Sequence, residues 1–566
     1  MTSRQEAKRI ANQERLLALG EAVDRRAGET SGRARRSASP SKRAKRAAPS
    51  SRTATRRWST RVGIGVLSLA LVVVVGAVAD YYYLGSLIHH KHVSHLQSGS
   101  GPENILLIGS TDRCALKVQK VAYGICQNGV TGINSDIVMV LHLNPATGAA
   151  SLLSIPRDTF IPNARTIYGN ANKIDAALVQ GPSQLVNAIE EDFAIPINHY
   201  VELNFETFAN VVDALGGVKM YFPTPVFDAE SGLHISFPGC YELNGYHALQ
   251  VVRARHLQIQ TTPGNFNFRS WRQEGQSDIA RIRRTHEFLR VLASKISANG
   301  LSNPVTDQSL ASSVVGSLIV DQNFSESHMV GLAETFAHVN IGNINQLTYP
   351  VASVVGGTYL YKGYYYGDVE FPINPTGSSV LQTIFGAAAN QDTFTYKPLP
   401  AHASFPITVE NGSGTSGQAG VIAAGLRAQG FDVVGDGSRT PTGHYTETIV
   451  WYGGGAPPAS GNWVNPGLQA AETVARRLGG PVTLGYDPAM VTPGALVTVQ
   501  TGDAASVVPV PVATASTSTT TPASTTSQAT SISPVLEPTT PTNQGLQPWD
   551  PRPCAPGERQ YVDKSP

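Results

Sequence analysis

Aspartate and arginine side chains recur where short polar segments interrupt the apolar stretches of this 566-residue chain. Guanidinium groups stay charged and can bind two phosphate oxygens at once, and carboxylates suit Mg²⁺ held jointly by protein and phosphate. Together they can stabilise a transferring phosphoryl group. The pattern therefore predicts a pyrophosphate site. Its candidate residues are Asp112 and Arg113 in GSTDR, Asp136 in NSD, Arg157 and Asp158 in IPRD, and Arg253 and Arg255 in VRARH.

The stretch ALQVVRARHLQ, residues 248–258, carries two of these arginines two positions apart. Interpreted as a strand, it points the side chains of Arg253 and Arg255 out of the same face of a sheet. Neighbouring positive charges repel each other, so the pair predicts an anion between them. His256 follows directly, and we favour a hydrogen-bonding neighbour over a catalytic base for it.

The pattern D-x-x-R-x-x-R is formed by Asp278, Arg281 and Arg284. In a helix this spacing predicts one shared face. The alternative interpretation is that each Asp–Arg pair is an ordinary structural ion pair. We favour an anion site because such pairs recur at the ends of apolar strands. The chain has no G-x-S-x-G or H-E-x-x-H motif of the kinds that indicate a serine hydrolase or a zinc protease.

Apolar runs and stretches with helical periodicity follow one another along the chain. The strands and helices that they predict must position these residues. Their mixture predicts a layered α/β (α+β) sheet-and-helix domain over 103–388. A linker at 389–404 and a small second α/β domain over 405–503 follow. The predicted strands are 103–110, 135–145 and 149–158, and the predicted helices are 183–193, 205–215 and 278–296.

Charge is distributed unevenly along the chain. Residues 1–61 hold 17 Lys and Arg but 5 Asp and Glu, whereas the rest holds 26 basic and 36 acidic residues. The basic segment predicts a disordered cytoplasmic tail that contacts anionic lipid rather than nucleic acid.

The stretch 62–79 is uncharged and long enough to cross a bilayer core. We predict a single transmembrane anchor over 62–84, a stalk at 85–102, and a folded part outside the cytoplasm. A cleaved signal peptide is the alternative, but the basic segment before it is too long for one.

The C-terminal segment 504–566 is rich in Thr, Ser and Pro, which predicts a disordered tail. The chain has four cysteines, and three disulfide pairings are possible. Our first expectation is Cys114 with Cys126, which closes a short loop, and Cys240 with Cys554, which ties back the tail.

Seven motifs in order resemble those of the LytR-CpsA-Psr (LCP) family, over roughly residues 103–296. The region 405–500 likewise resembles the LytR C-terminal domain of actinobacterial members. The motifs are NILLIGSTDR, SDIVMVLHLNP, LLSIPRDTF, KIDAA, HYVELNFETFANVVDALGGV, LNGYHALQVVRARH and SDIARIRRTHEFL.

This resemblance implies a membrane-anchored phosphotransferase. Members of the family move a glycopolymer, such as arabinogalactan, from a polyprenyl-pyrophosphate carrier to peptidoglycan through a phosphodiester. An apolar pocket would hold the prenyl tail, with arginines around the pyrophosphate at its mouth. The implied location is the cell membrane, crossed once, with the catalytic domain on the extracellular side.

The resemblance also implies roles for individual residues. The implied catalytic residues are Asp112, Asp136, Arg157, Asp158 and Asp278. The implied ligands of Mg²⁺, or of Mn²⁺, are Asp112 and Asp136. The expected pyrophosphate contacts are Arg113, Arg157, Arg253, Arg255, Arg281 and Arg284.

The chain departs from the family pattern in three places. A glutamine common after the last arginine is absent, with Thr285 and His286 nearby. Thr111 stands where the family usually has an aspartate, and Asn134 stands where it has an arginine whose contact Arg113 or Arg165 would replace. These departures keep two other functions open: hydrolysis of the pyrophosphate, and a non-catalytic scaffold that binds the carrier lipid. A transcriptional regulator is disfavoured, because the predicted anchor places the folded sequence across the membrane from DNA.

Overall fold

The computed structural model describes much of the chain, and the predicted basic tail (1–61) and anchor (62–84) lie outside the described residues. Among the helices that it describes, none is long and apolar enough to cross a membrane. The described residues are 86, 88–99, 101–114, 126, 132–162, 172–275, 277–299, 318–336, 344–354, 359–386, 391–437, 445–455, 463–509 and 545–561.

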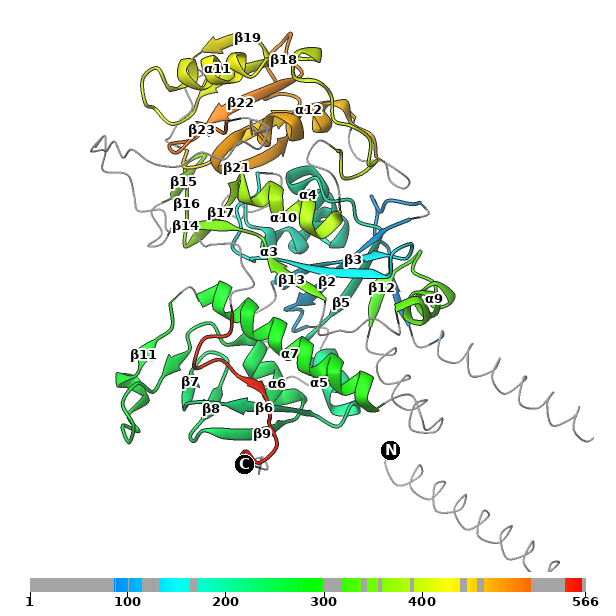
Figure 1. Cartoon of the computed structure of the whole chain (residues 1–566), viewed down its shortest axis with the longest axis vertical. Coiled ribbons are helices and arrows are strands. Elements are labelled where there is room, and N and C mark those ends of the chain that lie inside the picture. Colours follow the sequence, from blue (N-terminus) through cyan, green and yellow to red (C-terminus); the bar gives the residue numbers. More distant parts are fainter. Residues whose placement is uncertain are drawn as a thin grey trace, which may run out of the picture. The chain divides into compact units, whose positions relative to one another are not determined.

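A mixed seven-stranded sheet carries several of the candidate residues. Its strands are β1 (His89–Lys91), β2 (Glu103–Ser110), β3 (Ser135–Asn144), β4 (Ala149–Ile155), β5 (His199–Leu203), β12 (Ile319–Asp321) and β13 (Asn345–Thr348). Their order across the sheet is β1-β12-β5-β2-β3-β4-β13. Figure 1 labels β2, β3, β5, β12 and β13 of this sheet. The three predicted strands are confirmed as β2, β3 and β4. The segment 85–102 is not a separate stalk, because β1 pairs with β12 in this sheet.

The two faces of this sheet have different partners, because alternate side chains of a strand point to opposite faces. Leu106 and Val138 pack on one face in the main core, which also contains residues of α4 and α10. Leu107 and Met139 line a cavity on the other face. The helices on the first face are α3 (Ile174–Ala177), η3 (Leu178–Gln180), α4 (Pro182–Phe193) and α10 (Thr376–Phe385).

Three helices line the cavity face: α5 (Phe205–Ala214), α6 (Gly245–Arg253) and α7 (Ser277–Asn299). α5 begins with a capping box, in which the Asn204 side chain accepts from the Thr207 N–H at 2.9 Å. α5 and α6 approach closely, because a Cβ on Gly245 would lie 2.1 Å from the Ala209 carbonyl oxygen. The predicted helices at 183–193, 205–215 and 278–296 are confirmed as α4, α5 and α7.

Two four-stranded sheets and one further helix complete this part of the chain. One sheet has the order β11-β10-β7-β8, and the other has β6 and β9 at its centre. Their strands are β6 (Val218–Phe222), β7 (Val226–Asp228), β8 (Leu233–Ile235), β9 (Gly239–Leu243), β10 (Gln258–Ile259) and β11 (Arg272–Gln273), and the other elements are η4 (Phe268–Ser270) and α9 (Glu326–Phe336).

The two predicted domains share one sheet. Its main path is β14-β17-β21-β20-β22-β18-β19, and β17, which precedes the predicted linker, pairs with β21, which follows it. The boundary at 389–404 therefore does not separate two sheets. The elements are β14 (Val351–Val354), β15 (Tyr359–Tyr361), β16 (Tyr364–Tyr366), β17 (Val369–Asn374), η6 (His402–Ser404), β18 (Pro406–Asn411), α11 (Gln418–Ala428), β19 (Asp432–Gly437), β20 (Thr448–Tyr452), α12 (Pro466–Ala475), β21 (Leu478–Tyr486), β22 (Val497–Thr501) and β23 (Ser506–Val507).

Residues 545–561 are folded, which corrects the prediction of a disordered tail over all of 504–566. The strands β24 (Arg552–Pro553) and β25 (Gln560–Tyr561) pair with β6 and β9. We call residues 545–561 the C-terminal strap; it is red in Figure 1. The expected disulfides Cys114–Cys126 and Cys240–Cys554 are both present, and the second joins the strap to β9.

A buried carboxyl group in the shared sheet should make the stability of the folded chain depend on pH. Glu447 is fully buried, and burial raises its pKa to about 8, although the hydrogen bond from the Tyr359 hydroxyl (2.5 Å) opposes this. The folded chain keeps the proton up to about pH 8, whereas the unfolded chain loses it above its ordinary pKa of 4.5. The free energy of unfolding should therefore fall by roughly 1.4 kcal/mol per pH unit between these values.

The variant Glu447→Gln isolates this effect, because the amide oxygen can still accept from Tyr359 but carries no titrating proton. Urea unfolding measured from pH 5 to pH 8 should show a shallower loss of stability in the variant than in the parent chain. Equal slopes in the two proteins would contradict the assignment of the proton to Glu447.

Candidate active site

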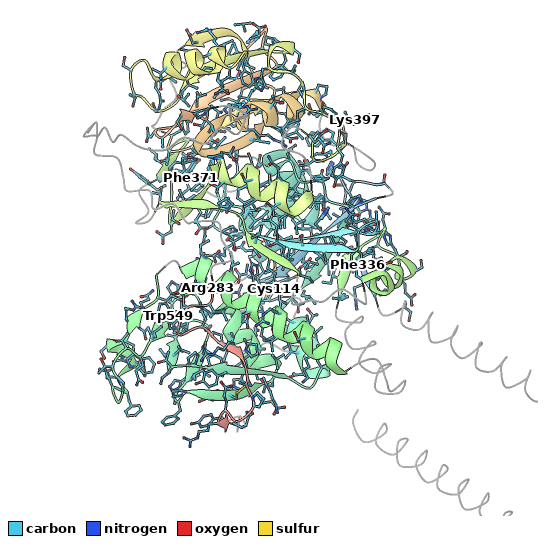
Figure 2. The ribbon with its side chains drawn as sticks, viewed as in Figure 1. Cys114, Arg283, Phe336, Phe371, Lys397 and Trp549 are labelled. Atoms are coloured by element: carbon cyan, nitrogen blue, oxygen red, sulfur yellow. A yellow bond between two sulfur atoms is a disulfide. The ribbon has the colours of Figure 1, made fainter. Side chains whose placement is uncertain are left out.

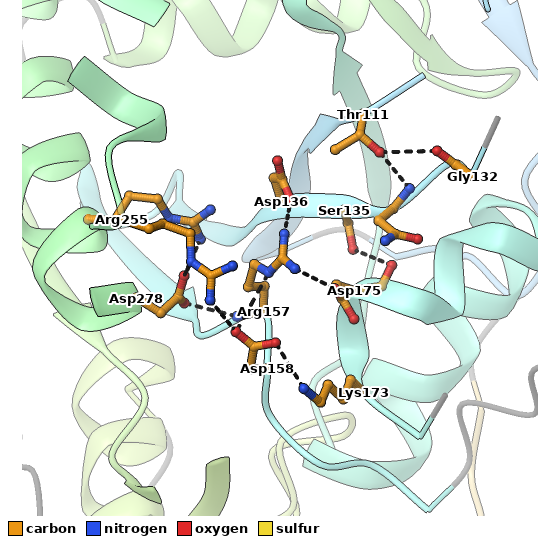
Figure 3. Close-up of polar contacts among 12 residues, drawn as sticks. Thr111, Gly132, Ser135, Asp136, Arg157, Asp158, Lys173, Asp175, Arg255 and Asp278 are labelled. Carbon is orange, nitrogen blue, oxygen red and sulfur yellow. Dashed lines mark hydrogen bonds and ion pairs between the residues drawn. The ribbon is translucent and has the colours of Figure 1, made fainter. Parts of the chain in front are cut away.

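The antiparallel pairing of three strands brings the predicted polar segments together. Ser110 of β2 lies opposite Ser135 of β3, and Val138 of β3 lies opposite Ile155 of β4. The end of β2, the start of β3 and the end of β4 therefore meet at one edge of the sheet. The polar segments that adjoin these strand ends converge there (Figure 3).

Arg157 is the centre of this cluster. Its Nη1 donates to Asp136 Oδ1, its Nη2 lies 3.2 Å from Asp175 Oδ2, and its Nε lies 3.7 Å from Asp158 Oδ2. Its backbone N–H donates to Asp278 Oδ2 at 3.3 Å. Burial alone would lower the pKa of Arg157, but these four carboxylates raise it above its ordinary value. The guanidinium is therefore a permanent, oriented positive charge.

Arg255 reaches the same cluster from the loop after α6 (Figure 3). Its Nη2 donates to Asp158 Oδ2 at 2.7 Å, and its Nε lies 3.6 Å from Asp278 Oδ1. Lys173 Nζ donates to the other oxygen of Asp158 at 3.2 Å. Although burial raises the pKa of Asp158, the charges of Arg157, Lys173 and Arg255 hold it below its ordinary value. Asp158 is thus an ionised residue that organises three cations.

Helix α7 supplies Asp278 and Arg281 to the cluster, but not Arg284. Arg281 Nη2 lies 2.9 Å from Asp278 Oδ1. Arg284 is 1% exposed, donates to Glu274, and donates to the Ala254 carbonyl at 2.5 Å. Helical residues six positions apart differ by about 120° in direction. The prediction of one shared face is therefore wrong, and Arg284 lies outside the cluster.

The predicted strand at 248–258 is also wrong. α6 ends at Arg253 and only Gln258–Ile259 form a strand, so the two guanidinium groups have different surroundings. Arg253 Cζ lies 4.5 Å from the centroid of the Phe205 ring, and Arg113 Cζ lies 5.5 Å from the same ring. Arg255 instead binds Asp158. The two arginines are thus on different sides of the site.

A helix could have been predicted for this stretch. Its apolar positions 248, 249, 251 and 252 recur three and four residues apart, which is helical spacing. Asn244 precedes them as an N-cap, and its side chain accepts from the His247 N–H at 2.9 Å. His256 lies outside the cluster, since its Nδ1 lies 3.0 Å from the carboxylate of the exposed Glu230.

An apolar cavity of about 150 Å³ opens beside the cluster. Strands β2, β3 and β5 form one wall, and helices α5, α6 and α7 form the other. Of the predicted site residues, Asp136, Arg253 and Arg281 line the cavity. Its apolar lining includes Leu107, Met139, Val201, Phe208, Leu249 and Leu289. An apolar chain that ends in an anionic group fits such a cavity.

Sequence reasoning missed three members of the cluster: Lys173, Asp175 and Glu370. Burial raises the pKa of Asp175 to about 6, although the nearby Arg157 opposes this, and burial raises the pKa of Glu370 well above its ordinary value. The Lys-x-Asp spacing inside the otherwise apolar KIDAA could have indicated the first two. Glu370 lies on β17, far along the chain, and its N–H donates to the Asp158 carbonyl at 3.0 Å.

Two of the positions that depart from the family pattern contact each other. The Asn134 N–H donates to Thr111 Oγ1 at 2.9 Å, and the Thr111 N–H donates to the Asn134 carbonyl at 2.9 Å. Thr111 thus connects the end of β2 to the start of β3 (Figure 3). Asp112 follows it, half-buried and outside the cavity lining. Arg165 lies outside the described residues.

Several buried polar atoms of the cluster have no hydrogen-bond partner within the described residues. They are the Nε atoms of Arg157, Arg255 and Arg281, and Glu370 Oε2. Buried donors normally have acceptors, so these three Nε atoms are donors that the cluster itself does not satisfy. These features define a layered α/β protein that can hold an anion joined to an apolar chain.

Comparison with known proteins agrees with this class. Residues 80–370 match the LytR_cpsA_psr family, and residues 404–504 match a family described as LytR cell envelope-related transcriptional attenuator. The first match covers more than half of the chain. The chain therefore belongs to the LytR-CpsA-Psr family.

Three curated relatives are similar over part of their length. The chain is 31% identical to the probable cell wall biosynthesis protein LcpB of Corynebacterium glutamicum, over 52% of this chain and 64% of that protein. It is 25% identical to the cell wall biosynthesis protein LcpA of the same organism, over 62% and 70%. It is 32% identical to the polyisoprenyl-teichoic acid–peptidoglycan teichoic acid transferase TagU of Bacillus anthracis, over 30% and 49%. The matched part is thus less than two thirds of the LcpB and TagU chains.

Two solved structures are also similar. The LytR-Csp2A-Psr enzyme from Actinomyces oris is 23% identical, with a TM-score of 0.40 over 52% of this chain and 95% of that one. Bacillus subtilis TagV is 23% identical, with a TM-score of 0.38 over 51% and 98%.

Proposed function

We propose that this protein transfers a glycopolymer from a polyprenyl-pyrophosphate carrier to peptidoglycan and makes a phosphodiester. The observation that carries the proposal is an apolar cavity lined by Asp136, Arg253 and Arg281, next to the carboxylates that bind Arg157 and Arg255. The TagU relative is named for a transfer of this kind. Arabinogalactan is the polymer that we expect for a chain with actinobacterial relatives.

The residues of the cluster have different roles in the proposed reaction. The prenyl chain enters the cavity, and the arginines bind the pyrophosphate at its mouth. A hydroxyl of the acceptor attacks the phosphorus next to the glycan, a new O–P bond forms, and the bond to prenyl phosphate breaks. An aspartate of the site accepts the hydroxyl proton. Asp158 and Asp278 hold the arginines in position.

The donor set fits a bound Mg²⁺, which proteins commonly hold through one or two carboxylates together with substrate phosphates. Asp136 has one oxygen engaged by Arg157, which leaves the other for a cation, and Asp112 is the second candidate ligand. Each arginine of the cluster already faces a carboxylate, so a bound pyrophosphate needs additional positive charge. The cation would supply that charge at the phosphoryl group.

The proposed setting is the outer side of the cell membrane, with residues 62–84 as the anchor. In this setting the lipid carrier in the membrane and the wall polymer outside it are both within reach of the domain. The basic residues 1–61 would remain on the cytoplasmic side, in contact with anionic lipid.

The test uses the purified full chain in detergent, with Mg²⁺, a synthetic prenyl-pyrophosphate-linked glycan and peptidoglycan oligomers. Mass spectrometry should detect a glycan–phosphate–peptidoglycan adduct together with free prenyl phosphate, and both should disappear in Arg255→Ala. Release of prenyl phosphate without an adduct would instead identify a pyrophosphate hydrolase. Tight binding of the lipid without turnover would identify a scaffold.

A further inference from the structure

Two histidines and a glutamate meet at the end of the seven-stranded sheet that is opposite the arginine cluster. Glu103 begins β2, His199 begins β5, and His328 lies in α9. Their potential ligand atoms all lie within 4.8 Å of one another. Because β2 rises by about 3.3 Å per residue from Glu103 to Ser110, this group is roughly 20 Å from the site proposed above.

The distances within this group suit a single ion. His328 Nε2 lies 2.9 Å and 3.0 Å from the two oxygens of Glu103, and His199 Nε2 lies 4.0 Å from Glu103 Oε2. Ligand atoms on one tetrahedral Zn²⁺, bound at about 2.0–2.1 Å, lie about 3.3 Å apart. These distances fall on both sides of this value, and all three potential ligand atoms lie within 4.8 Å of one another.

A buried carboxylate orients one of the histidines. Asp321 is fully buried, and its Oδ2 accepts from His199 Nδ1 at 3.0 Å. The proton on Nδ1 leaves the Nε2 lone pair directed toward Glu103. Carboxylate–histidine–metal relays of this form are the usual second layer of a zinc site. The His199 ring also stacks on Phe324 at 4.1 Å between ring centroids, which restricts its rotation.

We propose that Glu103, His199 and His328 bind one divalent transition-metal ion of the Zn²⁺ type. Two imidazole nitrogens and one carboxylate are a common three-residue donor set for zinc, with water in the fourth position. Hard cations such as Mg²⁺ prefer oxygen ligands, so this site would discriminate against the ion proposed for the arginine cluster. The bound ion would join α9 to strands β2 and β5.

The experiment measures binding of Zn²⁺ alone to the full chain, stripped with chelator and kept in millimolar Mg²⁺ to occupy the other site. Competition with a fluorescent zinc indicator should give one ion per chain. His328→Ala and Glu103→Gln should each weaken the affinity at least 10-fold. Both residues are partly exposed, so these variants should fold, which circular dichroism would check.

The matched control is His89→Ala, which removes an exposed histidine of β1 that is not among the three proposed ligands. It should retain the parent affinity, and Zn²⁺ should raise the melting temperature of the parent and of this control but not of His328→Ala. Equal zinc affinity in the parent and His328→Ala, loss of binding in His89→Ala, or a folded parent that binds no zinc would each overturn the proposal. The last result would identify the group as an ordinary histidine–carboxylate ion pair.

Discussion

Replacement of Arg157 with alanine should lower kcat/KM for glycopolymer transfer by about 100- to 1,000-fold, the loss typical of one transition-state donor. The side chain is held by Asp136, Asp158 and Asp175. In the proposed reaction its guanidinium group is therefore already held in place before the substrate arrives. Its removal also leaves the carboxylates around it without their shared cation.

Two further variants separate charge from geometry in this experiment. Arg157→Lys keeps the positive charge but loses the planar fork, so it should recover only a small part of the rate. Arg427→Ala is the matched control, because Arg427 is an exposed arginine paired with Asp436 on the C-terminal domain. It should transfer at the parent rate. Full activity in Arg157→Ala would remove this residue from the reaction and would favour the scaffold function.

Replacement of Asp550 with alanine should lower the free energy of unfolding by about 3–5 kcal/mol, the typical cost of removing one partner from a buried ion pair. Asp550 is fully buried in the C-terminal strap, and its Oδ2 lies 2.5 Å from Arg283 Nε of α7. Its loss leaves Arg283 and Arg284 to share Glu274. Two cations would then face one carboxylate in a buried space.

The strap makes a second contact with the same network, because Trp549 Nε1 donates to Glu274 Oε1 at 2.7 Å. Arg283 and Trp549 are both marked in Figure 2. Urea unfolding at pH 7 would measure the effect of Asp550→Ala. Asp436→Ala is the matched control, because its exposed ion pair should contribute less than about 1 kcal/mol. Similar losses in the two variants would show that the strap does not stabilise α7.

Local sequence patterns were sufficient for the central elements of the fold. Apolar runs predicted β2, β3 and β4, and helical periodicity predicted α4, α5 and α7, since one face of each is buried in a core. The same patterns misassigned 248–258, where two polar arginines at alternate positions resembled a strand. The apolar residues before Arg253 repeat at helical spacing, and burial of that face determined the structure.

The candidate site was only partly predictable for a different reason. Arg157 and Asp158 lie next to the end of a predicted strand, so their approach to Asp136 follows from strand pairing. Glu370 reaches the cluster through long-range contacts that no local pattern contains. The same limit applies to Arg284, whose direction depends on Glu274 and on the rotation of the helix.

The sequence by itself determined the family, the α/β class, and the choice of arginines and aspartates for an anionic substrate, but it left three cysteine pairings open. These properties depend on residue type and local spacing. Only the tertiary structure decided which arginines face the cavity, that β17 and β21 join the two predicted domains, and that the strap folds onto β6 and β9. These properties depend on contacts between segments far apart in the chain, where burial and pairing with a distant partner outweigh local preference.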